Sequence, residues 1–189
     1  MRYNLIVICL LTFFLESYSQ EKYITRDGFV EFISETDIET IHPKSNQLSC
    51  IFDINKSNIA FQIKMISFRF EKALMEEHFN EKYVESEKFP TSTFIGKLEV
   101  LEEGMYRDVS SSDYLDGKDI QVRASGDIKI HGINKHIIAY GSMKSINNMI
   151  HLESDFDLLI EDFRINIPSI VRKNISETVN VRLKVELKR

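Results

Sequence analysis

Few residues of this sequence combine the types and the spacing that chemistry requires. His78 has carboxylates on both sides, namely Glu76, Glu77, Glu81 and Glu85, and such a cluster could bind a metal ion. No second histidine follows within a helical turn, so the zinc-peptidase spacing is absent. An acidic helix with interspersed lysines is typical of a solvated face. We therefore expect no metal site and no cofactor.

Acid–base catalysis would need a carboxylate outside the solvated faces. Asp155 and Asp157 alternate with apolar residues, which indicates that they lie on the solvent-facing side of a strand. Asp162 lies where this alternation shifts, so Asp162 and His78 are the only catalytic candidates. His131 and His136 flank a predicted turn, where surface polarity explains them. No nucleophile elbow and no phosphate-binding glycine loop are present, so we expect no catalytic residue and no enzyme.

The N-terminus reads as an export signal. One positive charge, Arg2, precedes an apolar run over residues 5–15, and Ser17 and Ser19 have the spacing of a cleavage site. The run is too short to span a bilayer, which takes about 20 residues. We expect cleavage after Ser19, a periplasmic or secreted protein, and no membrane span in the mature chain. Cleavage leaves Cys50 as a single, buried core thiol.

Composition indicates one ordinary folded domain over residues 20–189. The 189 residues are 43% hydrophobic and 28% charged, which excludes a disordered chain and a polytopic membrane protein. A net charge of −5 without a basic block argues against nucleic-acid binding. Assembly state stays open, a homodimer included.

Period-two alternation predicts that most of the chain forms strands. It runs through residues 94–100, 120–130, 150–160, 163–167 and 179–187. Apolar parity switches between Met65 and Ile66, which suggests a bulge or a bend, and residues 132–135 suggest a tight turn. Residues 71–85 read as one helix with Met75, Phe79 and Tyr83 as its apolar stripe. About eight antiparallel segments favour a closed barrel.

Apolar residues are in surplus for such a fold. The chain has 13 Phe and no Trp, and many Phe have inward parity, so they either pack against each other or line a cavity for a chain-like apolar molecule. If a cavity exists, its expected lining is Phe52, Phe61, Ile63, Met65, Phe68, Phe94, Leu98, Ile128, Phe156, Leu158, Phe163 and Ile165.

Several motifs together resemble the YceI-like family. They are residues 70–96 with Phe89-Pro90, the run from Gly126 to Lys135, residues 162–168 and residues 28–34. The chain is most similar to short secreted members of Bacteroidetes type. The resemblance implies a lipocalin-like, eight-stranded antiparallel barrel with one helix and a polyisoprenoid or similar amphiphilic lipid inside. The opening Trp and the Asp-x-x-His-Ser pattern of better-known members are absent, so contacts to a head group are not carried over.

Three hypotheses follow. The first is an exported, non-enzymatic protein that holds an isoprenoid lipid or a quinone in its barrel. The second is a solid-core module that acts by protein interaction in envelope stress or assembly. The third is a lipid-modifying enzyme that uses His78 and Asp162.

Overall fold

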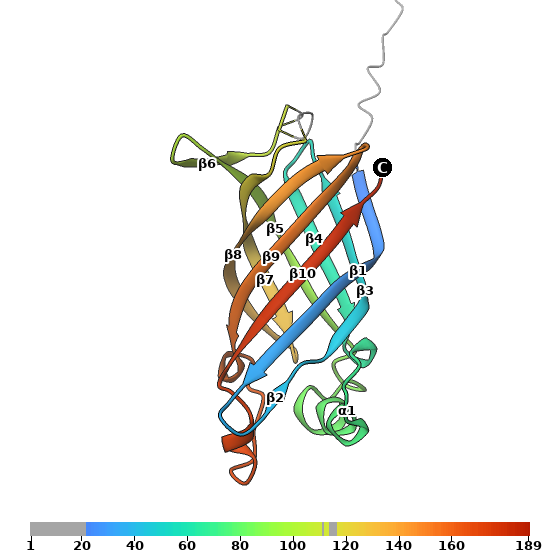
Figure 1. Ribbon diagram of the computed structural model, residues 1–189, viewed down its shortest axis with the longest axis vertical. Helices are drawn as coiled ribbons and strands as arrows, with labels where there is room; N and C mark the ends of the chain where they lie inside the picture. The colour runs from blue at the N-terminus through green and yellow to red at the C-terminus, as the bar shows by residue number, and fades with distance from the viewer. Residues whose placement is uncertain (1–21, 111, 114–116) are drawn as a thin grey trace, which may run out of the picture.

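The protein is a closed barrel of eight long antiparallel strands, as predicted (Figure 1). The computed structural model describes residues 22–110, 112–113 and 117–189. The predicted signal peptide lies outside the described residues. Barrel strands are β1 (Lys22–Glu35), β3 (Lys44–Asp53), β4 (Asn58–Lys64), β5 (Thr91–Glu102), β7 (Ile120–Ile130), β8 (Ile133–Ile146), β9 (Met149–Leu159) and β10 (Thr178–Leu187).

Each strand pairs with its neighbour along the chain, and β1 pairs with β10 to close the barrel. Two short strands extend the sheet at its edges: β2 (Thr40–Ile41) pairs with β1, and β6 (Met105–Asp108) pairs with β5. Successive side chains of a strand point alternately into the barrel and to solvent. In β10, Val185 and Leu187 are buried while Lys184 and Glu186 face solvent.

One end of the barrel is solid. Phe52, Ile59, Met143, Ile150 and Leu187 are fully buried there. Phe52 pairs with Ile59 across β3 and β4, and Leu187 pairs with Ile150 across β10 and β9. Figure 1 shows this end at the top, beside the C-terminus. The packed side chains close the barrel at this end.

Cys50 belongs to the solid region and gives a direct test of its packing. The thiol is buried, and burial raises its pKa because the thiolate is desolvated. In a protein of residues 20–189, whose single thiol is Cys50, we expect a thiol reagent to modify this thiol about a thousandfold or more slowly in the native than in the unfolded state, because reaction requires opening that costs about 5 kcal/mol or more. Stopped-flow absorbance with and without guanidinium measures this, and fast labelling of the native protein would contradict the packing.

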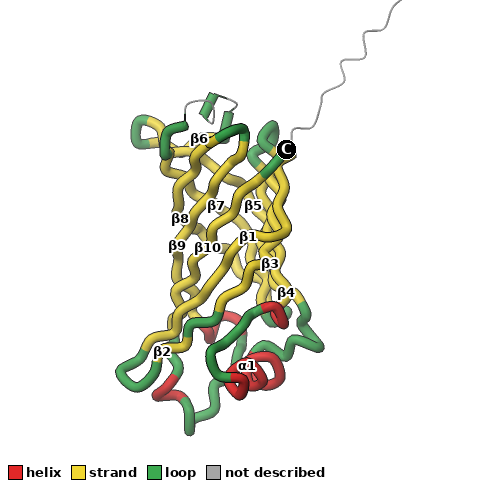
Figure 2. The backbone as a smooth tube through the Cα atoms, turned by 45° about the vertical axis from the view of Figure 1, so that its right-hand side comes forward, coloured by secondary structure: helices red, strands yellow, loops and turns green. Residues whose placement is uncertain are grey.

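The opposite end is covered by the segment between β4 and β5, which Figure 2 shows below the strands. It contains a 3₁₀ turn η1 (Met65–Ser67), helix α1 (Ala73–His78) and a π-helical turn η2 (Phe79–Tyr83). The predicted helix is confirmed but is shorter than residues 71–85. It ends before Val84, which is buried, and Glu85, which has a left-handed φ of 46°.

Two local expectations need correction. The parity switch after Met65 is the end of β4 followed by η1, not a bulge within a strand. Residues 163–167 form no strand: Phe163 ends a 3₁₀ turn η3 (Ile160–Phe163), and Arg164 is left-handed at φ 53°. A last 3₁₀ turn, η4 (Arg172–Asn174), precedes β10.

The β7–β8 turn consists of His131 and Gly132, both at positive φ, so it begins one residue before the predicted residues 132–135 and shares only Gly132 with them. At Gly132, with φ 76°, an added Cβ would lie 2.6 Å from Cε1 of Phe89.

Gly132→Ala is expected to lower the free energy of unfolding by about 2–3 kcal/mol. Left-handed backbone costs a non-glycine residue about 1–2 kcal/mol, and the contact with Phe89 adds to this cost. Gly104→Ala is the matched control, because Gly104 also has a positive φ (84°) but open space around its Cα. Urea denaturation of both variants separates backbone strain from the clash. Equal losses would contradict a tight Gly132–Phe89 contact.

The ladder between β8 and β9 covers only part of these strands. It runs from the pair Ile146–Met149 to the pair Gly141–Ser154. Within the described chain, residues 133–140 of β8 and 155–159 of β9 form no ladder with each other, although residues 133–143 of β8 pair with β7 and residues 150–159 of β9 pair with β10. The Ser154 hydroxyl donates to the Tyr140 carbonyl oxygen at 2.6 Å where the two strands diverge.

Candidate functional site: an apolar cavity at the helical end

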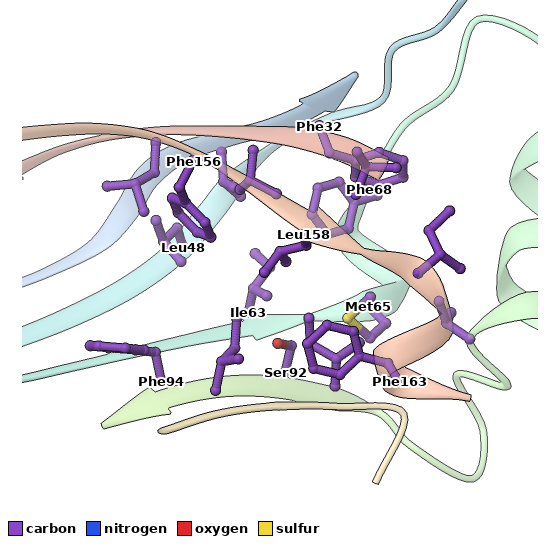
Figure 3. Close-up of a pocket in the computed structure, with 18 of the residues that line it drawn as sticks. Phe32, Leu48, Ile63, Met65, Phe68, Ser92, Phe94, Phe156, Leu158 and Phe163 are labelled. Carbon is purple, nitrogen blue, oxygen red and sulfur yellow. The ribbon is translucent and has the colours of Figure 1, made fainter. Parts of the chain in front are cut away.

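A cavity of about 350 Å³ lies in the barrel on the side of the helix, within the range of ligand pockets. Inward-pointing residues of all eight barrel strands line it. Figure 3 shows Phe156 and Leu158 of β9 on one side and Ile63 of β4 and Phe94 of β5 on the other, directed toward the same space. Among the described residues, the lining contains no lysine and no arginine. The space is therefore suited to an apolar molecule.

Eleven of the twelve predicted lining residues border this cavity: Phe61, Ile63, Met65, Phe68, Phe94, Leu98, Ile128, Phe156, Leu158, Phe163 and Ile165. Phe52 is not part of the wall. It points into the barrel but lies in the solid end, where it pairs with Tyr23 of β1 and Ile59 of β4. Strand parity gives the direction of a side chain but not its height along the barrel. Ligand contact by the eleven stays a prediction.

Sequence reasoning missed part of the wall. The missed residues include Phe32 of β1, Leu48 of β3, and Val179, Val181 and Leu183 of β10. The last three lie on the apolar face of a strand that was predicted from its alternation, so the same pattern could have identified them as lining residues. Met75, Phe79 and Tyr83, the predicted helix stripe, also border the cavity. The stripe thus covers the opening of the barrel.

Four phenylalanines hold the helical segment onto the barrel. Phe79 of η2 lies 5.6 Å from Phe32, 5.9 Å from Phe68 and 5.0 Å from Phe70 between ring centroids. Phe32 and Phe68 are 5.4 Å apart in an edge-to-face arrangement, which is favourable for aromatic pairs. All four border the cavity, so this cluster forms both the attachment of the helix and the rim of the wall.

Polar groups gather at the opening. Glu39, between β1 and β2, borders the cavity and accepts hydrogen bonds from Lys72 Nζ at 2.6 Å and Asn174 Nδ2 at 3.4 Å. The hydrogen bond from Lys72 is the main reason that the pKa of Glu39 is lowered, and Asn174 adds to it. One carboxylate therefore joins the β1–β2 connection, the start of α1 and η4 around the mouth.

The two catalytic candidates are not brought together. His78 borders the cavity, whereas Asp162 forms an ion pair with Lys135 Nζ at 2.7 Å and is outside the lining. Asp155 and Asp157 accept hydrogen bonds from Asn180 on the outer wall. Among the described residues, no group of three His, Cys, Asp or Glu could hold a metal ion.

His131 is structural rather than a surface residue, so that interpretation is wrong. Its ring lies 2.8 Å from Glu85 Oε2 and 3.0 Å from the carbonyl oxygen of Phe163, and it packs edge-on against Phe89 at 4.6 Å. The hydrogen bond with His131 is the largest cause of a lowered pKa at Glu85. His131 thereby ties the β7–β8 turn to the segment after the helix. His136 is exposed, as expected.

The cavity also reaches the diverging part of β8 and β9. Tyr140 and Gly141 of β8 and Glu153 and Ser154 of β9 are among its lining residues. Searched over the described residues, the structure contains no helix long and apolar enough to cross a membrane.

The fold and the site together define a class: an eight-stranded barrel, solid at one end, with an apolar cavity covered by a helix at the other. The profile of the YceI-like domain family matches residues 25–187, and the chain belongs to this family.

Solved structures share the fold. The polyisoprenoid-binding domain from Saccharophagus degradans, implicated in plant cell wall breakdown, superposes with a TM-score of 0.74 at 14% identity, covering 90% of this chain and 99% of that one. BcnA of Burkholderia cenocepacia has a TM-score of 0.67 at 11% identity, with 86% and 96% covered. The YCEI protein of Campylobacter jejuni has a TM-score of 0.55 at 14% identity, with 100% and 99% covered. No curated protein matches the sequence.

Proposed function

We propose that this chain is an exported, non-enzymatic lipid-binding protein. After removal of residues 1–19 it holds a polyisoprenoid or a similar amphiphilic lipid, such as a quinone, in the barrel and shields it from water in the periplasm or outside the cell. The observation that carries the proposal is the cavity of about 350 Å³, whose lining is apolar except near its openings.

The chemistry of the wall favours a long apolar chain with an uncharged body. Each Å² of apolar ligand surface that leaves water contributes about 25 cal/mol. Over the part of the chain that the structure describes, the lining has no lysine or arginine to pair with an anionic group. The solid end closes one end of the barrel, so a ligand that enters at the helical mouth keeps its polar end there, near Glu39 and Asn174. Membership in a family with a polyisoprenoid-binding structural relative supports the same ligand class.

The other two hypotheses have less support. A solid-core module would not need a cavity of this size, although the end of the barrel beside the C-terminus is solid. A lipid-modifying enzyme that uses His78 and Asp162 together would need both side chains at the cavity, and Asp162 is outside its lining.

Native mass spectrometry tests the proposal. The full chain, expressed in a bacterium and purified without detergent, is expected to have the intact mass of residues 20–189. It should also carry a noncovalent apolar adduct that organic solvent extracts. Protein that arrives empty and takes up neither a polyprenol nor a menaquinone in titration would overturn the lipid-binding function. An uncleaved N-terminus would overturn only the proposed export by this signal and would leave the lipid-binding function standing.

A further inference from the structure

Four large aliphatic side chains are exposed at the helical end of the barrel. They are Ile38 (62% exposed), Ile66 (61%), Leu74 (60%) and Ile170 (89%). They belong to four segments, the β1–β2 connection, η1, α1 and the loop before η4. Figures 1 and 2 show these segments together at the end opposite the C-terminus.

Each of the four is next in sequence to a residue that borders the cavity. Ile38 precedes Glu39, Ile66 follows Met65, Leu74 precedes Met75, and Ile170 precedes Val171. The apolar rim formed by Ile38, Ile66, Leu74 and Ile170 therefore lies around the mouth, and each of its residues has one sequence neighbour on the cavity wall. Single exposed aliphatic residues are ordinary on protein surfaces, but four around the opening of an apolar cavity mark an interaction site.

Charge helps to identify the partner. Basic Arg69, Arg172 and Lys173 lie on the same segments as acidic Asp37 and Glu71. Arg69 and Lys72 are paired with Glu76 and Glu39, so their charge is locally balanced. A rim of mixed charge obtains little electrostatic binding energy from an anionic surface. Its aliphatic side chains, in contrast, contribute favourable free energy when they leave water in any bilayer interface.

We propose that the apolar rim docks on the surface of a lipid bilayer and inserts Ile38, Ile66, Leu74 and Ile170 among the headgroups. The mouth then faces the membrane, and a lipid passes between bilayer and cavity without crossing water. This transfer role rests on the proposed lipid-binding function, but the docking can be measured without a ligand in the cavity.

The absence of tryptophan from the chain allows a clean reporter experiment. Three single-tryptophan variants, Leu74→Trp, Ile170→Trp and Met105→Trp, are mixed with phosphatidylcholine vesicles. Met105 is 70% exposed and follows β5 near the solid end, so it is the matched control. We expect a blue-shifted emission and quenching by brominated phosphatidylcholine for the two rim variants and neither for Met105→Trp.

A fourfold variant, Ile38→Ser, Ile66→Ser, Leu74→Ser and Ile170→Ser, is expected to lower vesicle partition by about tenfold or more. Its thermal midpoint should stay close to that of the parent, because all four side chains are exposed. Parent binding should change little when anionic lipid or salt is added.

Rim tryptophans that stay in water, or a fourfold variant that binds vesicles as well as the parent, would overturn the docking. Binding that requires anionic lipid and disappears in salt would also overturn it. Protein that carries a cavity lipid but does not insert would refute the docking and leave the lipid-binding function intact. Protein that inserts but never carries a lipid would refute the function and leave the docking intact.

Discussion

Ala124→Trp is expected to weaken lipid binding in the barrel while leaving the fold in place. Ala124 of β7 borders the cavity between Leu98 of β5 and Ala139 of β8, its partners in the two ladders. An indole there takes space that a ligand would fill. Removing about 100 Å² of ligand contact at about 25 cal/mol per Å² weakens binding by about 2.5 kcal/mol, roughly 70-fold.

Ile95→Trp is the control for this substitution. Ile95 is one residue from Phe94 on β5 but points outward and is 68% exposed, so the same side chain there should leave lipid retention unchanged. Lipid recovered per protein by solvent extraction, with circular dichroism to check the fold, compares the two variants. Full retention by a folded Ala124→Trp protein would show that lipid is held elsewhere.

Phe79→Ala is expected to produce the largest loss of stability among single substitutions at the mouth, about 3 kcal/mol. Phe79 is buried in the cluster with Phe32, Phe68 and Phe70, and truncating a buried phenylalanine typically costs about 3–5 kcal/mol. At about 2–4 °C per kcal/mol for a domain of this size, the thermal midpoint should fall by about 6–12 °C.

Leu74→Ala provides the comparison, since Leu74 lies on the same helical segment but is 60% exposed, and the expected change is within about 0.5 kcal/mol. Hydrogen exchange should show residues 73–83 losing protection in Phe79→Ala before the strands do. A thermal midpoint equal to that of Leu74→Ala would mean that the cluster does not attach the helix.

The barrel could be predicted because alternation is a local signal. Strand β7 coincides with the predicted residues 120–130, and β10 follows the alternation of Val179 to Leu187. The lining was predicted for the same reason, as parity separates Phe94 and Leu98 from Ile95. The helix and the closed barrel were also predicted from the residues, and the family resemblance added the expectation of a polyisoprenoid or similar amphiphilic lipid as the ligand, which stays a prediction.

Other features depend on contacts between distant residues, which no local pattern contains. Residues 163–167 alternate like a strand, but Arg164 adopts a left-handed conformation and no neighbouring strand pairs with them. His131 reads as a turn residue, yet Glu85 and Phe89 reach it from 46 and 42 positions away in sequence. The height of Phe52 depends on the stagger of neighbouring strands, which parity leaves undefined.

The incomplete β8–β9 ladder also bears on self-association. Complete closure removes strand edges, but residues 133–140 and 155–159 leave two edges on which a strand of another molecule could add. Charged and polar side chains occupy these stretches: Lys135 and His136 on one edge, Asp155 and Asp157 on the other. A strand added there would have to desolvate them, so these four residues oppose intermolecular sheet growth at the place where the β8–β9 ladder is incomplete.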